Sequence, residues 1–451
     1  MKIIIVGCGK VGYTLAAELN EKGNNIVVVD QDAAKVKEVA NKLDLLGVIG
    51  NGATRETQKE AGVDGADLFI AVTGSDELNL LCCVMAKKAS DCHTIARVKN
   101  PEYASDSPYL KDELGLAMVI NPEYAAAKEI SKVLNFPNAL KIESFSKGRV
   151  ELMKFRLPEG SPLVGMSVKN VVMKLKSNVL VCVVERDDDA FIPNGDFVFA
   201  DRDIVSIVAP PRAAIDFFKK IGYQAQPARS AIVLGGKTTT FYLCELLAKT
   251  GISLKIIERD AALCEELANR FDTATVIKAN PTDQSTLIEE GLEKTDALVA
   301  LTDIDEENIM LSLLGKKCGT KKVITRINRE EYTDVIKSLD LDSIVYPKNI
   351  TADMILRYVR AMKNTRGSSM ETLYNLVKGK VEAAEFRVSE HSPIIGTPLS
   401  ELELRPGVLV AAILRGKTTI VPRGSAVIEP GDSVVIVSKS LTLTDVSDVL
   451  A

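Results

Sequence analysis

The first thirty residues combine a glycine-rich turn with two apolar strand patterns, and few folds accept that combination. The strand pattern of residues 2–6 runs into Gly7-Cys8-Gly9-Lys10-Val11-Gly12, and a helical pattern then leads to a second strand at 26–29. In such a unit the first glycine permits a tight turn, the second lets a pyrophosphate approach the backbone, and the third lets the helix pack on the strand. The segment therefore predicts a parallel α/β sheet that places phosphate at a helix N-terminus.

The acid that closes the second strand indicates which dinucleotide this turn suits. Asp30 follows Gly12 by 18 residues, where a carboxylate accepts hydrogen bonds from a ribose 2′-hydroxyl and repels a 2′-phosphate. The position favours NAD over NADP, and the neighbouring Gln31 is included among the candidate cofactor-binding residues. One alternative stays open, in which the glycines only close a turn in a sheet that binds nothing.

A weakened copy of the same segment recurs halfway along the chain. The offset is 228 residues at first and 229 after one inserted residue. The matching positions are Gly7 and Gly235, Asp30 and Glu258, Gly62 and Gly291, Asp67 and Asp296, Thr73 and Thr302, Asp76 and Asp305, Asn79 and Asn308, and Arg97 and Arg326. The chain is therefore a tandem of two similar halves.

Each half is predicted to be a Rossmann-like doubly wound parallel sheet followed by a small α+β module. The expected domains span residues 1–121, 141–225, 229–348 and 370–451, and the strands of the first sheet are expected near 2–6, 26–30, 46–49, 67–72, 94–98 and 117–120. Linkers are expected at 137–148, 224–229 and 364–369. Helical patterns at 123–134 and 351–362 have apolar residues on more than one face, which is typical of helices that pack on a partner subunit.

Composition excludes several classes of function. The chain has 56 basic and 61 acidic residues, so it lacks the positive footprint of a nucleic-acid-binding protein. Met1 leads directly into a strand pattern and no apolar run approaches the roughly 18 residues of a spanning helix, so we expect a soluble cytoplasmic protein. Eight cysteines without a CxxC motif fit a reducing compartment, and no metal site is expected.

Catalytic residues are scarce. A nicotinamide dehydrogenase needs a placed proton donor or acceptor, and the only histidines, His93 and His391, have no evident orienting carboxylate. Gly235-Gly236-Lys237-Thr238 imitates the end of a P-loop, but Ala231 stands where that motif needs a glycine. These features favour a binding protein that is not an enzyme. An NAD-dependent oxidoreductase and a scaffold with vestigial sites remain as alternatives.

These motifs together resemble the peripheral subunit of Trk-type potassium uptake systems, which consists of two RCK units. The matching residues are the glycine-rich turn, Asp30, Gly50-Asn51-Gly52, the segment 71–79 and Arg97. The resemblance covers essentially the whole chain. It implies a regulator that assembles into a ring, a tetramer by expectation, on the inner face of the plasma membrane. The ring docks on a membrane-embedded potassium transporter, and bound NAD or NADH, or ATP or ADP at the same site, changes its shape.

The remaining candidate contacts lie at the ends of later strands of the first sheet. Asn51 and Gly52 are expected to face the adenine, and Thr73 and Gly74 to lie beside the phosphates and the distal ribose. The Arg97 guanidinium can offer charge-assisted bonds to phosphate. Alternatively, Arg97 pairs with a carboxylate such as Asp76.

The second copy departs from the pattern in its glycine-rich turn. Lys237 and Thr240 replace the second and third glycines, which compromises both backbone approach and helix packing. Pro281 also removes a backbone donor after the third strand. Since Glu258, Thr302 and Arg326 survive as candidate cofactor-binding residues, we expect a degenerate or differently selective second site.

Overall fold

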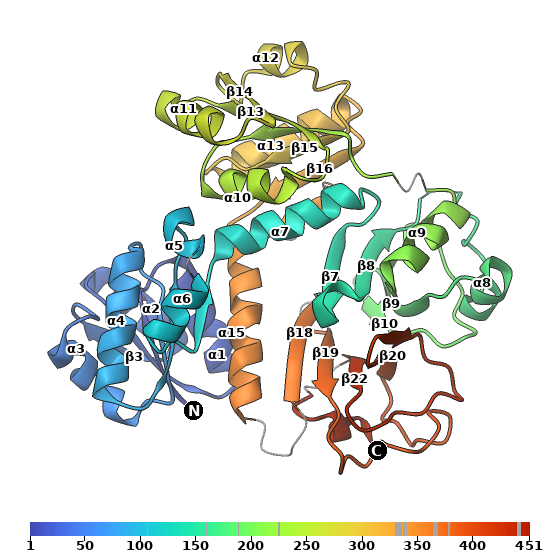
Figure 1. Cartoon of the computed structure of the whole chain (residues 1–451), viewed down its shortest axis with the longest axis horizontal. Coiled ribbons are helices and arrows are strands. Elements are labelled where there is room, and N and C mark those ends of the chain that lie inside the picture. Colours follow the sequence, from blue (N-terminus) through green and yellow to red (C-terminus); the bar gives the residue numbers. More distant parts are fainter. Residues whose placement is uncertain are drawn as a thin grey trace.

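The computed structural model describes residues 1–105, 107–158, 160–187, 189–223, 226–329, 336, 339, 341–363, 369–377, 379–439 and 443–451. The chain forms two six-stranded parallel sheets and two five-stranded sheets, in alternation along the sequence (Figure 1). This arrangement confirms the predicted fold class of two Rossmann-like sheets, each followed by a small module. Residues 224–225 of one expected linker and 364–368 of another lie outside the described residues.

The first sheet has the strand order β3-β2-β1-β4-β5-β6. The elements of this unit are β1 (Lys2–Val6), α1 (Lys10–Glu21), β2 (Asn25–Asp30), α2 (Ala33–Leu43), β3 (Leu46–Ile49), α3 (Arg55–Glu60), β4 (Leu68–Ala71), α4 (Asp76–Ala89), β5 (His93–Arg97), α5 (Pro101–Ser105), α6 (Ser107–Glu113), β6 (Met118–Ile120) and α7 (Pro122–Asn135). All six predicted strands are confirmed to within one residue at each end. Both faces of the central strands are buried, which explains their unbroken apolar sequence.

The first module is an antiparallel sheet of order β10-β9-β11-β8-β7. Its elements are β7 (Lys141–Phe145), β8 (Val150–Arg156), α8 (Val168–Leu175), β9 (Leu180–Arg186), β10 (Asp189–Phe191), β11 (Ile204–Ala209) and α9 (Pro211–Lys220). The prediction of a linker over 137–148 was wrong, because residues 141–145 form the edge strand β7. Ile142 and Phe145 are buried there, so the segment is held by its apolar side chains and by pairing with β8.

The second half repeats the first. Its parallel sheet, of order β14-β13-β12-β15-β16-β17, has the elements β12 (Ser230–Leu234), α10 (Thr238–Leu247), β13 (Ser253–Glu258), α11 (Ala261–Arg270), β14 (Ala274–Lys278), α12 (Gln284–Glu289), β15 (Ala297–Ala300), α13 (Asp305–Lys317), β16 (Lys322–Arg326), β17 (Ser343–Val345) and α15 (Pro347–Lys363). The second module, of order β18-β19-β22-β20-β21, has β18 (Ser369–Val377), β19 (Val381–Arg387), β20 (Val408–Arg415), β21 (Thr418–Ile420) and β22 (Ser433–Lys439). In the described part of the chain no helix combines the length and apolar character needed to cross a membrane.

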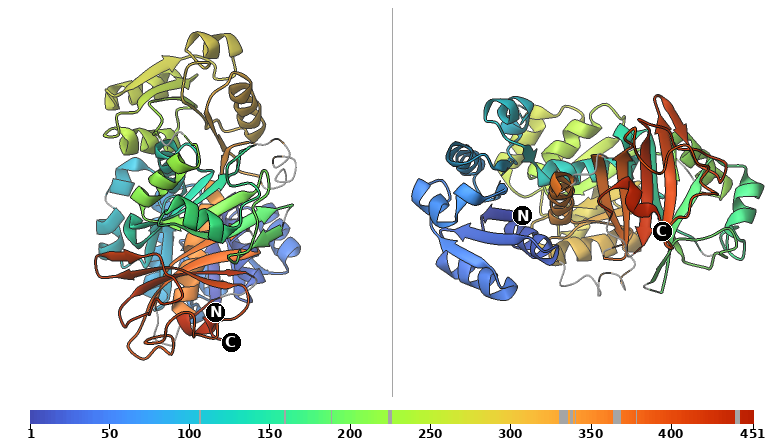
Figure 2. Two further views of the ribbon diagram at one scale, coloured as in Figure 1. Left: turned by 90° about the vertical axis from the view of Figure 1, so that its right-hand side faces the viewer. Right: turned by 90° about the horizontal axis from the view of Figure 1, so that it is seen from below.

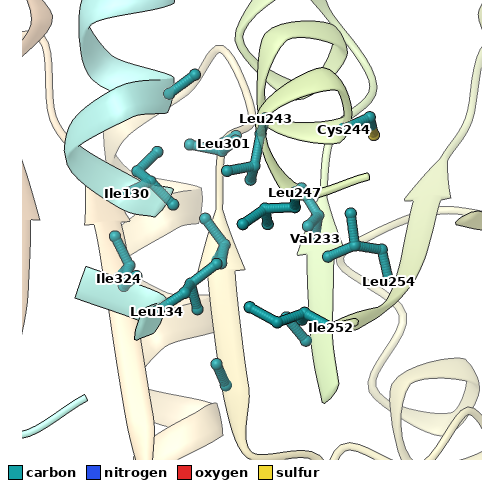
Figure 3. Close-up of a cluster of buried hydrophobic side chains, with 14 of the residues drawn as sticks. Ile130, Leu134, Val233, Leu243, Cys244, Leu247, Ile252, Leu254, Leu301 and Ile324 are labelled. Carbon is teal, nitrogen blue, oxygen red and sulfur yellow. The ribbon is translucent and has the colours of Figure 1, made fainter. Parts of the chain in front are cut away.

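Helix α7 of the first half covers the sheet of the second half. Its apolar side chains Ile130 and Leu134 pack into a buried cluster with Val233, Leu243 and Leu301 (Figure 3). The prediction that this helix packs on a partner subunit was therefore wrong, because it packs on the second half of the same chain. The duplication places an equivalent docking face within the same chain, and α7 uses that face.

Helix α15 of the second half in turn covers part of the sheet of the first half. Ile355 and Val359 on α15 pack with Ile3, Ile5 and Leu15 of the first unit, so each half contributes the helix that covers part of the other half's sheet. In Figure 1, α15 stands beside the blue first unit and α7 runs beneath the yellow-green second unit. The two halves are consequently interlocked and share their cores.

The two modules also pack on each other (Figure 2). Phe145 and Val183 of the first module lie in one cluster with Ala383 and Val435 of the second. The buried carboxylate of Glu385 adds a polar tie, since it accepts hydrogen bonds from the Ser146 amide at 3.1 Å and the Ser433 hydroxyl at 2.7 Å. The modules thus form a second interface between the halves.

The exchange predicts that a core mutation in α7 destabilises the joint between the halves. Leu134 is fully buried against the second sheet, and a buried Leu→Ala change typically costs about 2–5 kcal/mol. We expect Leu134→Ala to lower the thermal unfolding midpoint clearly, while Met173→Ala, at a side chain 64% exposed, should leave it close to that of the wild type. Equal midpoints for both variants would contradict the packing of α7.

Candidate functional site

A cavity of about 540 Å³ lies at the carboxyl ends of β1 and β4. From β1 the strands continue through β2 and β3 to one edge of the sheet, and from β4 they continue through β5 and β6 to the other edge. Parallel α/β sheets bind ligands at such a switch point. The lining residues are Val6, Gly7, Gly9, Lys10, Val11, Asp30, Gln31, Lys35, Gly50, Gly52, Val72, Thr73, Gly74, Leu78, Arg97, Pro122, Glu123, Arg326, Asn328, Pro347 and Lys348.

The glycines of the first turn make space at this cavity. Gly7 has φ +108°, a conformation that side chains rarely adopt, and a Cβ on Gly12 would lie 1.8 Å from the Gly7 carbonyl oxygen. A Cβ on Gly9 would meet nothing within 4 Å. Gly7 and Gly12 are therefore required for the turn and for helix packing, whereas Gly9 leaves open room where the backbone meets the cavity.

Asp30 holds the glycine-rich turn from the end of β2. One carboxylate oxygen accepts a hydrogen bond from the Cys8 amide at 2.7 Å, and the other accepts one from the Asp32 amide at 3.0 Å. Each oxygen retains a further lone pair for a ligand hydroxyl. The thiol of Cys8 is buried, and burial raises its pKa to about 12, so it is a packing group and not a nucleophile.

A buried asparagine ties the ends of β4 and β5 together. The Asn79 side chain accepts hydrogen bonds from the amide and hydroxyl of Thr73, both at 2.7 Å, and donates to the Arg97 carbonyl at 3.0 Å. Asn308 makes the corresponding bonds to Thr302 and Arg326 in the second unit. The repeated spacing of Thr, Asn and Arg thus reflects a structural network that positions these strand ends.

The Arg97 guanidinium pairs with Glu123 at the start of α7, at 2.9 Å. The alternative partner Asp76 instead accepts hydrogen bonds from the amides of Lys99 and Asn100. Within the described residues, Arg97 Nε and Glu123 Oε2 are buried without a hydrogen-bond partner. Buried unpaired polar atoms are costly, and here they mark unused bonding capacity beside the cavity.

The second half completes the cavity of the first. Arg326, Asn328, Pro347 and Lys348 line it from the end of β16 and the start of α15. Arg326 Nε also lacks a partner in the described part of the chain. The lining contains five cationic side chains, Lys10, Lys35, Arg97, Arg326 and Lys348, and two anionic ones, Asp30 and Glu123. The excess of positive charge suits an anionic ligand that touches both halves.

The equivalent turn of the second unit is occupied by its own side chains. Lys237, at the position of Gly9, forms an ion pair with Asp303, which stands at the position of Gly74. Thr240 replaces the third glycine, and its hydroxyl donates to the Gly235 carbonyl at 2.6 Å. Glu258 accepts hydrogen bonds from the amides of Gly236 and Asp260. The ion pair thus spans two positions that are open in the first unit.

The structure places the predicted residues in three groups. The cavity is lined by Gly7, Gly9, Lys10, Val11, Asp30, Gln31, Gly52, Thr73, Gly74, Arg97 and, unexpectedly, Arg326. Cys8, Gly12 and Asn51 lie beside the turns but not in the lining, and Glu258 and Thr302 belong to the second unit. Sequence reasoning missed Glu123, Asn328 and Lys348. Glu123 lies at the start of α7, just after β6 of the first sheet, whereas Asn328 and Lys348 reach the cavity from the second half.

Comparison with known proteins identifies the family of this chain. TrkA-N domains match residues 3–122 and 231–347, and TrkA-C domains match residues 152–222 and 383–450. The chain belongs to the TrkA family of Trk system potassium uptake proteins. It is 35% identical to Trk system potassium uptake protein TrkA homolog 1 of Methanosarcina mazei, over 99% of both chains. Identity to Trk system potassium uptake protein TrkA of Halomonas elongata is 32%, over 97% of this chain and 95% of the relative.

Solved structures share the fold of the whole chain. The GsuK RCK domain superposes with a TM-score of 0.65 at 18% identity, over 97% of this chain and 92% of that one. The GsuK channel bound to NAD gives the same TM-score at 17% identity, over 97% of this chain and 77% of the channel. These neighbours confirm the tandem arrangement of Rossmann-like sheets and modules.

The asparagine network predicts a specific loss of stability. Asn79→Ala would leave the Thr73 amide and the Arg97 carbonyl without these bonds, and each buried unpaired group costs about 1–3 kcal/mol. We expect a clear drop in the thermal midpoint, with Asn41→Ala, on the exposed surface of α2, as the control. A midpoint for Asn79→Ala as high as that of the control would mean that the network does not stabilise the strand ends.

Proposed function

We propose that the chain is the nucleotide-binding regulatory subunit of a potassium uptake system and controls transport through a separate membrane protein. Relatives across the full length are named Trk system potassium uptake proteins, and a neighbour of the same fold is a channel bound to NAD. The observation that carries the proposal is the cavity itself, because it is cationic, it begins at a glycine-rich turn and it is lined by both halves.

The cavity residues fit an adenine dinucleotide. The Gly9 position leaves room for a pyrophosphate at the start of α1, and Asp30 has lone pairs for ribose hydroxyls. Arg97 and Arg326 have unpaired Nε atoms for phosphate oxygens. We propose NAD or NADH as the ligand, with ATP or ADP as alternatives, because all four share the adenosine and pyrophosphate that these residues would contact.

Regulation would follow from the composite lining of the cavity. A ligand that binds the glycine-rich turn and Arg326 together favours one relative position of the two halves. Typical coupling free energies of about 1–3 kcal/mol change the affinity at a second site roughly 5- to 150-fold. We propose that copies of the chain form a ring, a tetramer, on the cytoplasmic face of the membrane, and that the ring passes this change to the transporter.

The lining favours binding without chemistry. In the described part of the chain, histidine, tyrosine and cysteine are all absent from the cavity wall. Its lysines and arginines serve as phosphate partners in this proposal, and Glu123 is already paired with Arg97. A hydride-transfer enzyme would need a proton-transfer group placed beside the nicotinamide. We therefore propose that the nucleotide acts as an effector and is released without chemical change.

The contribution of the second half is tested by binding. Arg326→Ala should weaken NADH binding about tenfold or more, because charge-assisted hydrogen bonds contribute roughly 1.5–3 kcal/mol each. Asp30→Ala should produce a loss of the same order through the ribose. The matched control is Arg259→Ala, an exposed arginine of the same half that does not line the cavity. Isothermal titration calorimetry gives the affinities and the number of sites.

The same titration decides between one and two sites per chain. Since Lys237 and Asp303 pair across the second turn, we expect one NADH per chain, and Glu258→Ala should leave that value unchanged. Two equivalent sites, or an Arg326→Ala affinity equal to that of wild type, would contradict the composite site.

Control of transport is tested by closing the first turn in the way the second turn is closed. The double variant Gly9→Lys, Gly74→Asp introduces the residues of the Lys237–Asp303 pair at the matching positions, and should abolish both NADH binding and nucleotide-dependent potassium uptake in cells carrying the partner transporter. Gly65→Lys, at an exposed glycine with open space around its Cα, is the control. If a double variant that binds no nucleotide still supports potassium uptake at the wild-type level, the ring is a scaffold and bound nucleotide does not control transport.

A further inference from the structure

The first cavity, at the carboxyl ends of β1 and β4, has two acidic side chains in its described lining. Asp30 closes β2, whereas Glu123 begins α7 shortly after β6. The cationic side chains of the described lining are Lys10, Lys35, Arg97, Arg326 and Lys348. The cavity therefore attracts phosphate, and on the β4-β5-β6 side Glu123 is the only described lining residue that would repel it.

The strand order indicates which part of a dinucleotide Glu123 would meet. In sheets of this kind each half of the strand order takes one mononucleotide, with the pyrophosphate at the switch point. Asp30 marks the adenosine side because it closes β2. Arg97, the partner of Glu123, closes β5, which lies three strand spacings or roughly 14 Å from β2. Glu123 consequently stands on the side of the group that follows the pyrophosphate.

The Glu123 carboxylate has acceptor positions to spare. Its Oε1 is 2.9 Å from Nη2 of Arg97, and its Oε2 is without a hydrogen-bond partner in the described part of the chain. A carboxylate offers about four acceptor positions, and the last torsion of a glutamate side chain has a broad range. The side chain is 16% exposed, so a small rotation can present an accepting oxygen to a donor that enters beside Arg97.

The position of the carboxylate is fixed by its surroundings. Asn121 caps α7, since its side chain accepts a hydrogen bond from the Tyr124 amide at 2.8 Å. Glu123 lies in the first turn of this 14-residue helix, where the helix dipole stabilises negative charge. The ion pair with Arg97 stabilises the same charge. Glu123 therefore presents an anionic acceptor at a defined place in the cavity.

The second half shows that the fold does not require an acid here. Helix α15 begins with Pro347-Lys348, in the same place after β17 as Pro122-Glu123 after β6. Lys348 also lines the first cavity, and its ammonium donates to the Asn328 carbonyl. Since a helix of the same type begins with a residue of opposite charge, Glu123 is explained better by what it faces than by the needs of the helix.

Adenine nucleotides differ in the group that follows the pyrophosphate. In NAD and NADH this group is a ribose, whose hydroxyls are hydrogen-bond donors. In ATP it is a third phosphate, which is anionic, and in ADP there is none. A carboxylate forms a strong charge-assisted bond with a hydroxyl, whereas it repels a phosphate, most strongly in a partly buried site.

We propose that Glu123 is a specificity-determining residue that favours a distal ribose over a third phosphate. Its carboxylate accepts a hydrogen bond from a hydroxyl of that ribose while it keeps its contact with Arg97. A third phosphate at the same place meets the negative charge of Glu123. The inference rests on the proposed function, since it assumes that nucleotides bind this cavity, and it narrows the ligand class from adenine nucleotides in general to adenine dinucleotides.

The test compares ligands that differ only beyond the pyrophosphate. ADP has no further group, ADP-ribose adds the distal ribose, and ATP adds the third phosphate. Each is titrated by calorimetry into wild type, Glu123→Gln and Glu113→Gln, with EDTA present so that no divalent cation shields the third phosphate. The Glu113 control removes an exposed acid of α6 that does not line the cavity.

We expect Glu123→Gln to lower the affinity for ADP-ribose relative to ATP about tenfold, because a charge-assisted bond is weakened and a repulsion is removed. Affinities are divided by that for ADP, which cancels any general gain from releasing Arg97. Glu113→Gln should keep the wild-type ratio. NADH should follow ADP-ribose, since it carries the same distal ribose.

A ratio of ADP-ribose to ATP affinity that is the same in Glu123→Gln and wild type would overturn the inference, while binding itself would leave the proposed function standing. Failure of wild type to bind any of these nucleotides would overturn both. Retained ADP binding shows that the variant is folded. If Glu123→Gln loses ADP as well, Glu123→Asp decides, because it keeps the charge but withdraws it by one methylene, and an unchanged ratio there counts against the inference.

Discussion

The exchange of α7 and α15 between the two halves is the interaction on which the rest of the structure depends. Each helix buries its apolar face on the sheet of the other half, so neither half has a complete core by itself. The same helices present their N-termini to the first cavity and polar side chains to a second cavity of about 1100 Å³. Both cavities are therefore built in part from elements that the two halves share.

Duplication explains how the two halves can differ at equivalent positions, with an open turn in the first half and an occupied turn in the second. The first turn keeps its three glycines, whereas the second turn has Lys237 paired with Asp303 and Thr240 bonded to Gly235. Arg326 meanwhile occupies the same place in its own unit as Arg97 but reaches the first cavity. The second half thus retains the fold, and four of its residues line the cavity of the first half.

Sequence predicted the sheets and the first turn because these depend on local patterns. Short, unbroken apolar runs indicated the strands, and the glycine spacing with Asp30 identified the switch point. The places of Arg326 and Lys348 in the first cavity could not be predicted, since they depend on how two units far apart in sequence pack together. The strand β7 could not be predicted for a different reason. Its buried residues, Ile142 and Phe145, are three positions apart, so the segment lacks the period-two pattern that marks a strand.

The central claim is that one nucleotide would be held by both halves at once. A crystal structure of the chain with NADH tests it most directly. The account predicts pyrophosphate oxygens within about 3 Å of both the Gly9 backbone amide and the Arg326 guanidinium, with Asp30 bonded to a ribose hydroxyl. A nucleotide held by the first unit alone, with Arg326 turned away from the phosphates, would contradict it.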